Sequence, residues 1–174
     1  MISPLNGMQA TYNDREETVV DFSNAEIVEM INSTREGSVW EILDIKLVSA
    51  EKDKVIATMP IGPHHRQQVG YLHGGISVVL AESVASLGTV LNIDADRQMA
   101  FGLEINANHL RPKRDGQLTA VATPIHRGRT THVWDVKLTD ENDKLVCISR
   151  CTVAVVDRPP DNGNLFAKKL PSFG

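Results

Sequence analysis

The most constraining part of the chain is residues 67–92, where a glycine-broken loop runs into a long apolar segment. Apolar residues recur in it at three- and four-residue steps, the period of an α-helix: Ile76, Val79, Leu80, Val84, Leu87 and Leu91. Small residues fill many of the remaining positions, so neighbouring elements can pack closely on most sides. This pattern predicts one long, largely buried helix that the rest of the chain surrounds.

One carboxylate, that of Glu82, falls in the third turn of this apolar helix. Burying an unpaired carboxylate is costly, so we expect Glu82 to have a partner, a raised pKa or a cavity to face. Ser86 lies four residues later, on the same side of the helix, where its hydroxyl can hold the carboxylate. The alternative without a functional role is a buried glutamate that polar neighbours satisfy.

The start of the helix carries the sequence His73-Gly74-Gly75. Backbone N–H groups in a first helical turn lack intrahelical partners, and the helix dipole adds about half a positive charge there. Glycine also lets a ligand approach the backbone. We therefore predict an oxyanion site in which the Gly74 N–H is the main donor, Gly75 allows close packing, and His73 or Gln67 adds a side-chain donor. The alternative for His73 is a helix-terminal residue that the backbone satisfies.

An oxyanion site together with the carboxylate of Glu82 suggests acyl transfer. Gly74 and Glu82 are eight residues apart, which corresponds to about 12 Å of rise along a helix. One carbonyl group cannot contact both residues of a single helix. If both act on the same bond, one of them must come from a second copy of the chain, and the spacing therefore predicts a shared site at a dimer interface.

These residues resemble the motif of hotdog-fold acyl-CoA thioesterases. The features in common are His73-Gly74-Gly75, an acid nine positions after the histidine and Gln67 six positions before it. The resemblance is strongest to the branch that hydrolyses 4-hydroxybenzoyl-CoA or 1,4-dihydroxy-2-naphthoyl-CoA, the phenylacetic-acid-degradation type. It runs over residues 39–157 and includes residues 103–112, residues 126–129 and Trp134. The fold that it implies is α+β, with a long central helix wrapped by an antiparallel sheet of about six strands.

The resemblance also implies an activity, the hydrolysis of an aromatic or bulky acyl-CoA to free acid and CoA. Glu82 would be the nucleophile or the general base, and the Gly74 N–H the oxyanion donor. Ser86 matches an assisting position of the family, and Gln67 matches a glutamine that contacts the carbonyl. The family implies no cofactor, because CoA is part of the substrate. It implies a homo-oligomer with a dimer as the minimum active unit, assembled into a homotetramer.

Two other functions are compatible with the pattern. One is an enoyl-CoA hydratase or dehydratase on the same fold, although that chemistry needs an acid–base pair across two carbons and His73 instead adjoins the oxyanion glycines. The other is a non-catalytic acyl-CoA-binding module, against which an intact Glu82 argues. Release of CoA from a thioester distinguishes a thioesterase from both of these alternatives.

Basic residues lie on two predicted turns of an otherwise acidic protein. Among them we favour Arg111 and Arg129 as contacts of the CoA phosphates; the alternative is a solvated rim. His109 ends a predicted strand and faces either the acyl ring pocket or the surface. The adjacent His64 and His65 lack a matching set of carboxylates or cysteines, so we predict no metal site.

Composition excludes several classes of function. A net charge of −4 and 5% aromatic residues argue against a nucleic-acid-binding surface. No apolar run reaches membrane length, and the first residues lack the basic start and apolar core of a secretory signal. Cys147 and Cys151 would lie about 13 Å apart on one strand, too far to bridge. We therefore expect reduced cysteines, a cytoplasmic protein, and neither a nucleic-acid nor a membrane partner.

The expected organisation is an N-terminal extension over residues 1–37, a hotdog domain over residues 38–157 and a tail over residues 158–174. Ser23 and Glu26 form a capping-box pattern that predicts a short helix over residues 24–32. Gly128 is expected to take a positive φ in a tight turn. Alternation and turn signals predict strands over residues 42–50, 54–60, 100–110, 117–126, 130–139 and 144–156.

Overall fold

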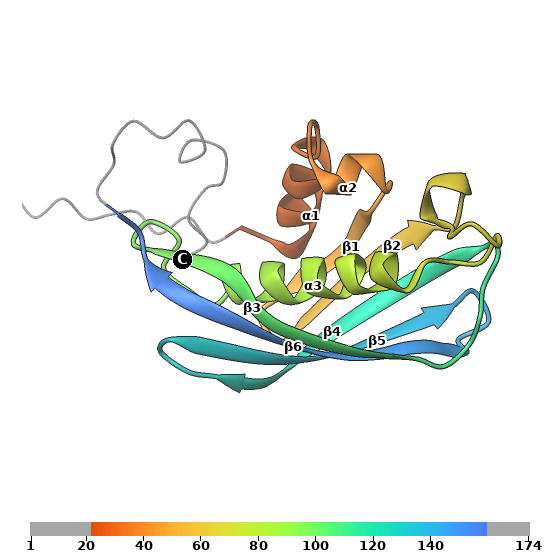
Figure 1. Cartoon of the computed structure of the whole chain (residues 1–174). Helices are drawn as coiled ribbons and strands as arrows, with labels where there is room; N and C mark the ends of the chain where they lie inside the picture. The colour runs from red at the N-terminus through yellow and green to blue at the C-terminus, as the bar shows by residue number, and fades with distance from the viewer. Residues whose placement is uncertain (1–21, 160–174) are drawn as a thin grey trace, which may run out of the picture.

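Six antiparallel strands form a single sheet in the order β1-β2-β4-β5-β6-β3, which curves around one long helix (Figure 1). The computed structural model describes residues 22–159. Its helices are α1 (Asn24–Ser33), α2 (Val39–Ile42), the 3₁₀ turn η1 (Pro63–His65) and α3 (Gly74–Val90). Its strands are β1 (Lys46–Glu51), β2 (Lys54–Pro60), β3 (Gln98–His109), β4 (Gln117–Arg127), β5 (Thr131–Asp140) and β6 (Leu145–Asp157). The α+β class, the central helix and the six strands agree with the prediction.

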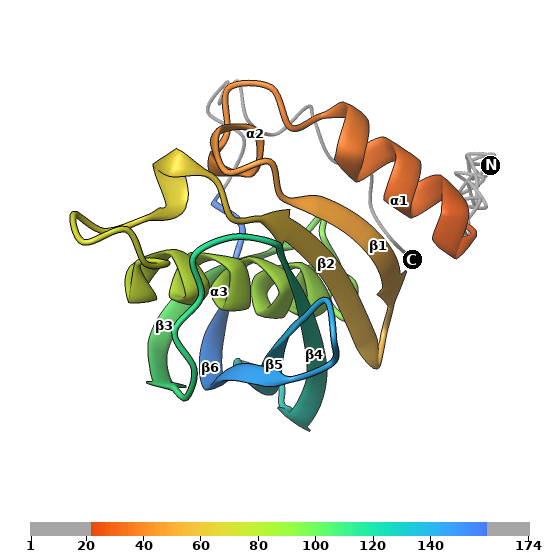
Figure 2. The ribbon, with the colours of Figure 1, turned by 90° about the vertical axis from the view of Figure 1, so that its right-hand side faces the viewer.

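The helix α3 lies in the hollow of the curved sheet, as the view turned by 90° shows (Figure 2). Its small residues let the sheet approach closely. A Cβ atom on Gly88 would lie 2.6 Å from Cη2 of Trp134, a fully buried residue of β5. The Trp134 Nε1–H donates to the hydroxyl of Thr89 at 2.9 Å, so its polar atom is satisfied in the core. The small residues of α3 therefore position the helix against the sheet.

The strand β3 forms one edge of the sheet, paired only with β6 within the described residues. Its ladder is interrupted by a register shift between Gly102 and Glu104. On either side of this glycine, Phe101 is 51% and Leu103 is 65% exposed. A twelve-residue edge strand with exposed apolar side chains offers unpaired backbone groups to another chain.

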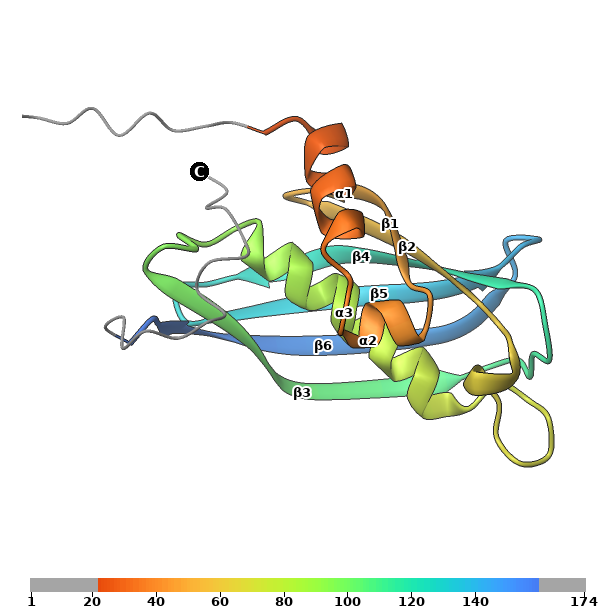
Figure 3. The ribbon, with the colours of Figure 1, turned by 90° about the horizontal axis from the view of Figure 1, so that it is seen from above.

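The N-terminal part of the described chain differs in one place from the prediction. The helix α1 begins with the expected capping box of Ser23 and Glu26. The strand expected from residue 42, however, begins only at Lys46, because residues 39–42 form the short helix α2. The Ile45 N–H donates to the Trp40 carbonyl at 2.8 Å, and this turn precedes the start of pairing with β2. Figure 3 shows α2 over the middle of α3, on the side away from the sheet.

Gly128 does not have the positive φ that we expected. Among the described glycines, φ is positive at Gly37, Gly70 and Gly116. The β4–β5 turn is instead closed by the Gly128 N–H, which donates to the Thr131 carbonyl at 2.9 Å. No helix within residues 22–159 is long and apolar enough to cross a membrane. Most of the predicted N-terminal extension and tail lies outside the described residues.

Candidate active site

The start of α3 presents one free backbone donor. His73 is the N-cap, and its Nδ1 accepts a hydrogen bond from the Gly75 N–H at 2.9 Å. The Gly75 donor is therefore occupied, whereas the Gly74 N–H makes no hydrogen bond within residues 22–159. A neutral His73 whose Nδ1 accepts carries its proton on Nε2, which remains a donor. At this helix start the Gly74 N–H is thus the backbone donor that remains free, and His73 caps the helix.

A cavity of about 340 Å³ lies beside this helix start. It brings together Gly74 with His109, whose ring packs so closely that a Cβ on Gly74 would lie 2.7 Å from its Nε2. Arg111 also lines it and donates to the Leu145 carbonyl at 2.8 Å. Ser77, 1% exposed, lines the same cavity with a hydroxyl that has no partner within the described chain. His109 therefore lies at the helix start and not in the cavity that Glu82 lines.

Gln67 lies in the loop that leads into α3. Its backbone forms a tight turn, because its N–H donates to the Tyr71 carbonyl at 2.8 Å and its carbonyl accepts from the Gly70 N–H at 2.9 Å. Gly70 has φ +86° in this turn, a conformation that favours glycine. The Gln67 side chain makes no hydrogen bond within the described residues, so its amide can meet a ligand.

Glu82 lines a larger cavity, of about 550 Å³, on the face of α3 turned away from the sheet. The carboxylate thus has the cavity that we expected it to face. Ser86 lines the same cavity, but no hydrogen bond joins it to Glu82 in the described chain. The predicted support by Ser86 is therefore absent in this arrangement, although both side chains face the same space.

Gly102 is a site residue that the sequence analysis missed. A Cβ built on it would lie 2.0 Å from Oε1 of Glu82, so the carboxylate occupies the space that a side chain would fill. The available signal was a glycine inside a predicted strand, which often marks the close approach of another group. Gly102 connects the carboxylate of Glu82 to the exposed edge of the sheet.

The two arginines favoured for CoA phosphates lie near opposite ends of the helix α3. Arg111 follows β3, beside the start of α3. Arg129 lies in the turn between β4 and β5, close to the end of α3, where Arg127 donates to Asn92 at 2.9 Å (Figure 1). One copy of the chain therefore does not bring both arginines to one phosphate group.

Both cysteines are free and buried in the core. Burial raises the pKa of Cys151 to about 12, and the negative charges of Glu82 and Glu104 add to this effect. Its thiol is therefore protonated near neutral pH and is a poor nucleophile. Within residues 22–159 no group of three His, Cys, Asp or Glu side chains is placed to hold a metal ion.

Comparison with known proteins gives consistent matches. Residues 69–147 match the family described as the thioesterase superfamily. A 1,4-dihydroxy-2-naphthoyl-CoA hydrolase of Listeria monocytogenes is 52% identical over 115 residues, which are 66% of this chain and 93% of the relative. A protein of the same name from Escherichia coli is 41% identical over 129 residues, which are 74% of this chain and 94% of the relative.

Among solved structures, the crystal structure of a mutant thioesterase from Pseudomonas aeruginosa superimposes with a TM-score of 0.73 at 44% sequence identity. The match covers 75% of this chain and 94% of that one. The six-stranded sheet around α3 is therefore the hotdog fold of these enzymes. At these identities and coverages, the chain belongs to the thioesterase superfamily and is a thioester hydrolase.

Proposed function

We propose that the protein is an acyl-CoA thioesterase that hydrolyses an aromatic or otherwise bulky acyl-CoA to the free acid and CoA, acting in the cytoplasm. The observation that carries this proposal is the carboxylate of Glu82, which lines a cavity of about 550 Å³. This volume is within the usual range for small-molecule sites. Six of the twelve lining residues are apolar: Ile31, Val39, Trp40, Val79, Leu87 and Val90. The names of the two hydrolases support a CoA thioester with an aromatic acyl group.

In the proposed reaction the thioester carbonyl oxygen accepts hydrogen bonds from the Gly74 N–H and Gln67. Glu82 attacks the carbonyl carbon to form an anhydride that water then hydrolyses, or it takes a proton from an attacking water. In both routes the C–S bond breaks and the CoA sulfur leaves with a proton. His73, through Nε2–H, is the proposed donor near the carbonyl or the leaving sulfur. The donors stabilise charge that develops in the transition state.

We propose that this site is shared between two copies of the chain. Gly74 and Glu82 lie on one continuous helix, about 12 Å apart in rise, so one carbonyl cannot meet both. The open edge of β3 supports the pairing of two copies, and Glu82 reaches that edge at Gly102. Glu82 of one subunit would then attack a thioester held by Gly74 of the other. We expect two such dimers to form the homotetramer.

The test is release of CoA from a panel of aromatic, long-chain and short-chain acyl-CoAs, including an enoyl-CoA. Wild type is compared with Glu82→Ala and with Glu29→Ala, an exposed carboxylate on α1 that serves as the matched control. We expect turnover of an aromatic acyl-CoA by wild type and Glu29→Ala, and a rate at least about 10²-fold lower for Glu82→Ala. Hydration of the enoyl-CoA without CoA release, or binding without turnover, would contradict the proposal.

A further inference from the structure

The cavity that Glu82 lines has a second wall that the proposed chemistry does not use. One wall is α3, with Val79, Leu87 and Val90 around the carboxylate. The opposite wall is residues 31–40, which comprise the end of α1, its connection to α2 and the start of α2. Any group in this cavity that reaches Glu82 must therefore lie between α3 and this segment.

Trp40 is the largest side chain of the second wall. It is half-buried and packs partly against the core. Its carbonyl accepts the Ile45 N–H at 2.8 Å, which ties α2 to the start of β1. An indole with a fixed backbone offers a flat apolar surface, and such surfaces favour offset-stacked or edge-to-face contacts with other aromatic rings.

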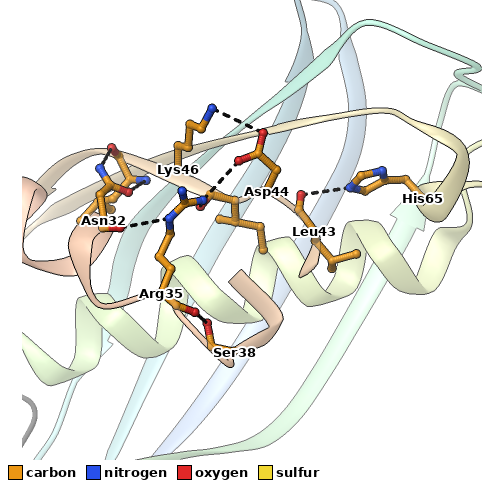
Figure 4. A network of polar contacts seen from close by, with 9 residues as sticks. Asn32, Arg35, Ser38, Leu43, Asp44, Lys46 and His65 are labelled. Atoms are coloured by element: carbon orange, nitrogen blue, oxygen red, sulfur yellow. Dashed lines mark hydrogen bonds and ion pairs between the residues drawn. The ribbon is translucent and has the colours of Figure 1, made fainter. Parts of the chain in front are cut away.

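A polar clamp, defined here as Asn32, Arg35 and Asp44, fixes this wall to β1 (Figure 4). The Asn32 side chain bonds the Leu47 backbone twice, since its Nδ2 donates to the carbonyl and its Oδ1 accepts the N–H, each at 2.9 Å. Arg35 donates from Nε to the Asn32 carbonyl at 3.1 Å and from Nη1 to Asp44 at 3.3 Å. Its Nη1 also donates to the Ile45 carbonyl at 2.9 Å. Three acceptors therefore hold the Arg35 side chain in place.

Resting on the proposed function, we propose that Trp40 is a specificity-determining residue that selects a planar aromatic acyl group in front of Glu82. The polar clamp acts as the positioning device that sets the distance between Trp40 and α3. A flat ring can contact Trp40 and α3 at once and bury apolar surface on both faces. A short acyl group that reaches Glu82 is too small to fill the space up to Trp40, so contact with the indole adds no binding free energy for it.

The experiment compares kcat/KM for CoA release from benzoyl-CoA and from acetyl-CoA. For Trp40→Ala we expect kcat/KM to fall about 10- to 200-fold with benzoyl-CoA, the size of an altered apolar pocket contact, and to stay within about twofold with acetyl-CoA. Trp40→Phe keeps a ring and should retain most of the selectivity. Ile42→Ala, on the same short helix but 71% exposed and outside the cavity, is the matched control and should change neither value.

The polar clamp is tested with Arg35→Gln, which removes the guanidinium group and its hydrogen bonds but keeps a polar side chain. If the clamp positions Trp40, this variant raises KM for benzoyl-CoA more than it lowers kcat and leaves acetyl-CoA unaffected. Equal losses for both substrates with Trp40→Ala would overturn the proposal, because the tryptophan would then act on folding or on the chemistry. Unchanged selectivity would overturn it as well.

A binding measurement separates this inference from the thioesterase proposal. The probe is a non-hydrolysable benzyl thioether of CoA, compared with an ethyl thioether, titrated against wild type and Trp40→Ala by calorimetry. We expect wild type to prefer the benzyl compound and Trp40→Ala to lose that preference. If the benzyl compound bound in a Trp40-dependent way but wild type hydrolysed no thioester, the proposed aromatic pocket would stand and the proposed thioesterase activity would be wrong. If wild type bound both probes equally, the proposed role of Trp40 would be wrong, even if thioester hydrolysis were normal.

Discussion

The carboxylate of Glu82, the proposed attacking group, lies where a side chain on Gly102 would be. In the substitution Gly102→Ala, the new Cβ would lie 2.0 Å from Oε1 and 3.0 Å from Cδ of Glu82. An ordinary contact needs 3.4–4 Å, so the carboxylate has to move by roughly 1 Å or more. A displacement of about 1 Å can cost on the order of 10²-fold in rate, or about 2.7 kcal/mol of barrier.

The same substitution should leave stability intact. Gly102 does not occupy the left-handed region of φ, so alanine fits the backbone, and the group displaced is the end of a flexible side chain. Replacing glycine in a strand also removes conformational freedom from the unfolded chain, worth up to about 0.5–1 kcal/mol. We therefore expect an unchanged or slightly higher free energy of unfolding together with the lower rate. This combination distinguishes a displaced catalytic group from a damaged fold.

The assay is kcat for CoA release from one aromatic acyl-CoA, with urea unfolding of each variant measured in parallel. Gly62→Ala is the control, because its Cβ would make an ordinary contact of 3.6 Å with His65. Shortening the acid in Glu82→Asp should remove most of the clash, so the penalty of Gly102→Ala should shrink in that background. A Gly102→Ala variant with wild-type kcat would refute the reasoning, because catalysis would then not require the carboxylate where the structure places it.

Three further outcomes follow from the packing and the charges. Gly88→Ala places a Cβ 2.6–2.9 Å from three ring carbons of the buried Trp134, and should lower the free energy of unfolding in urea by about 1–3 kcal/mol. The Lys144 N–H donates to the Asp140 carboxylate and holds its pKa below the usual range. The ionised carboxylate therefore stabilises the fold above the ordinary carboxyl pKa, and this stability is lost as pH falls through the lower, folded-state pKa. When unfolding is measured as a function of pH, the difference in the free energy of unfolding between wild type and Asp140→Asn should shrink toward acid pH. With its pKa raised to about 12 by burial, Cys151 should react with a thiol reagent near neutral pH only after unfolding by guanidinium.

Periodicity and local signals were sufficient for most of the fold. The apolar steps of α3, the capping box of α1 and the alternation of the later strands depend on neighbours in sequence, and the structure has each of these elements within a few residues of the expected bounds. The predicted start of β1 was wrong because residues 39–42 form the helix α2, so that pairing with β2 begins only at Lys46. Arg35 donates to the carbonyl of Ile45, ten residues later and just before β1, and apolar periodicity does not reveal a contact of this kind.

The candidate site was likewise only partly predictable from the sequence. The free N–H of Gly74 and the cavity beside Glu82 could be predicted, because a helix start and a lone carboxylate in an apolar helix have physical consequences wherever they occur. The contact between Glu82 and Gly102 could not, since it depends on where β3 crosses α3. For the same reason the sequence did not show that His109 lies against Gly74, away from the cavity that Glu82 lines.

The central claim is that Glu82 of one subunit attacks a thioester held by Gly74 and Gln67 of another. The most direct measurement is CoA release by a mixture of Glu82→Ala and Gln67→Ala, unfolded and refolded together, compared with each variant refolded alone. Random pairing would give mixed dimers in which one of the two sites carries neither lesion. Activity should then rise above both parents toward about a quarter of the wild-type rate. If the mixture showed only the average of the two parents, each site would use Glu82 and Gln67 of the same subunit, and the shared site would be wrong.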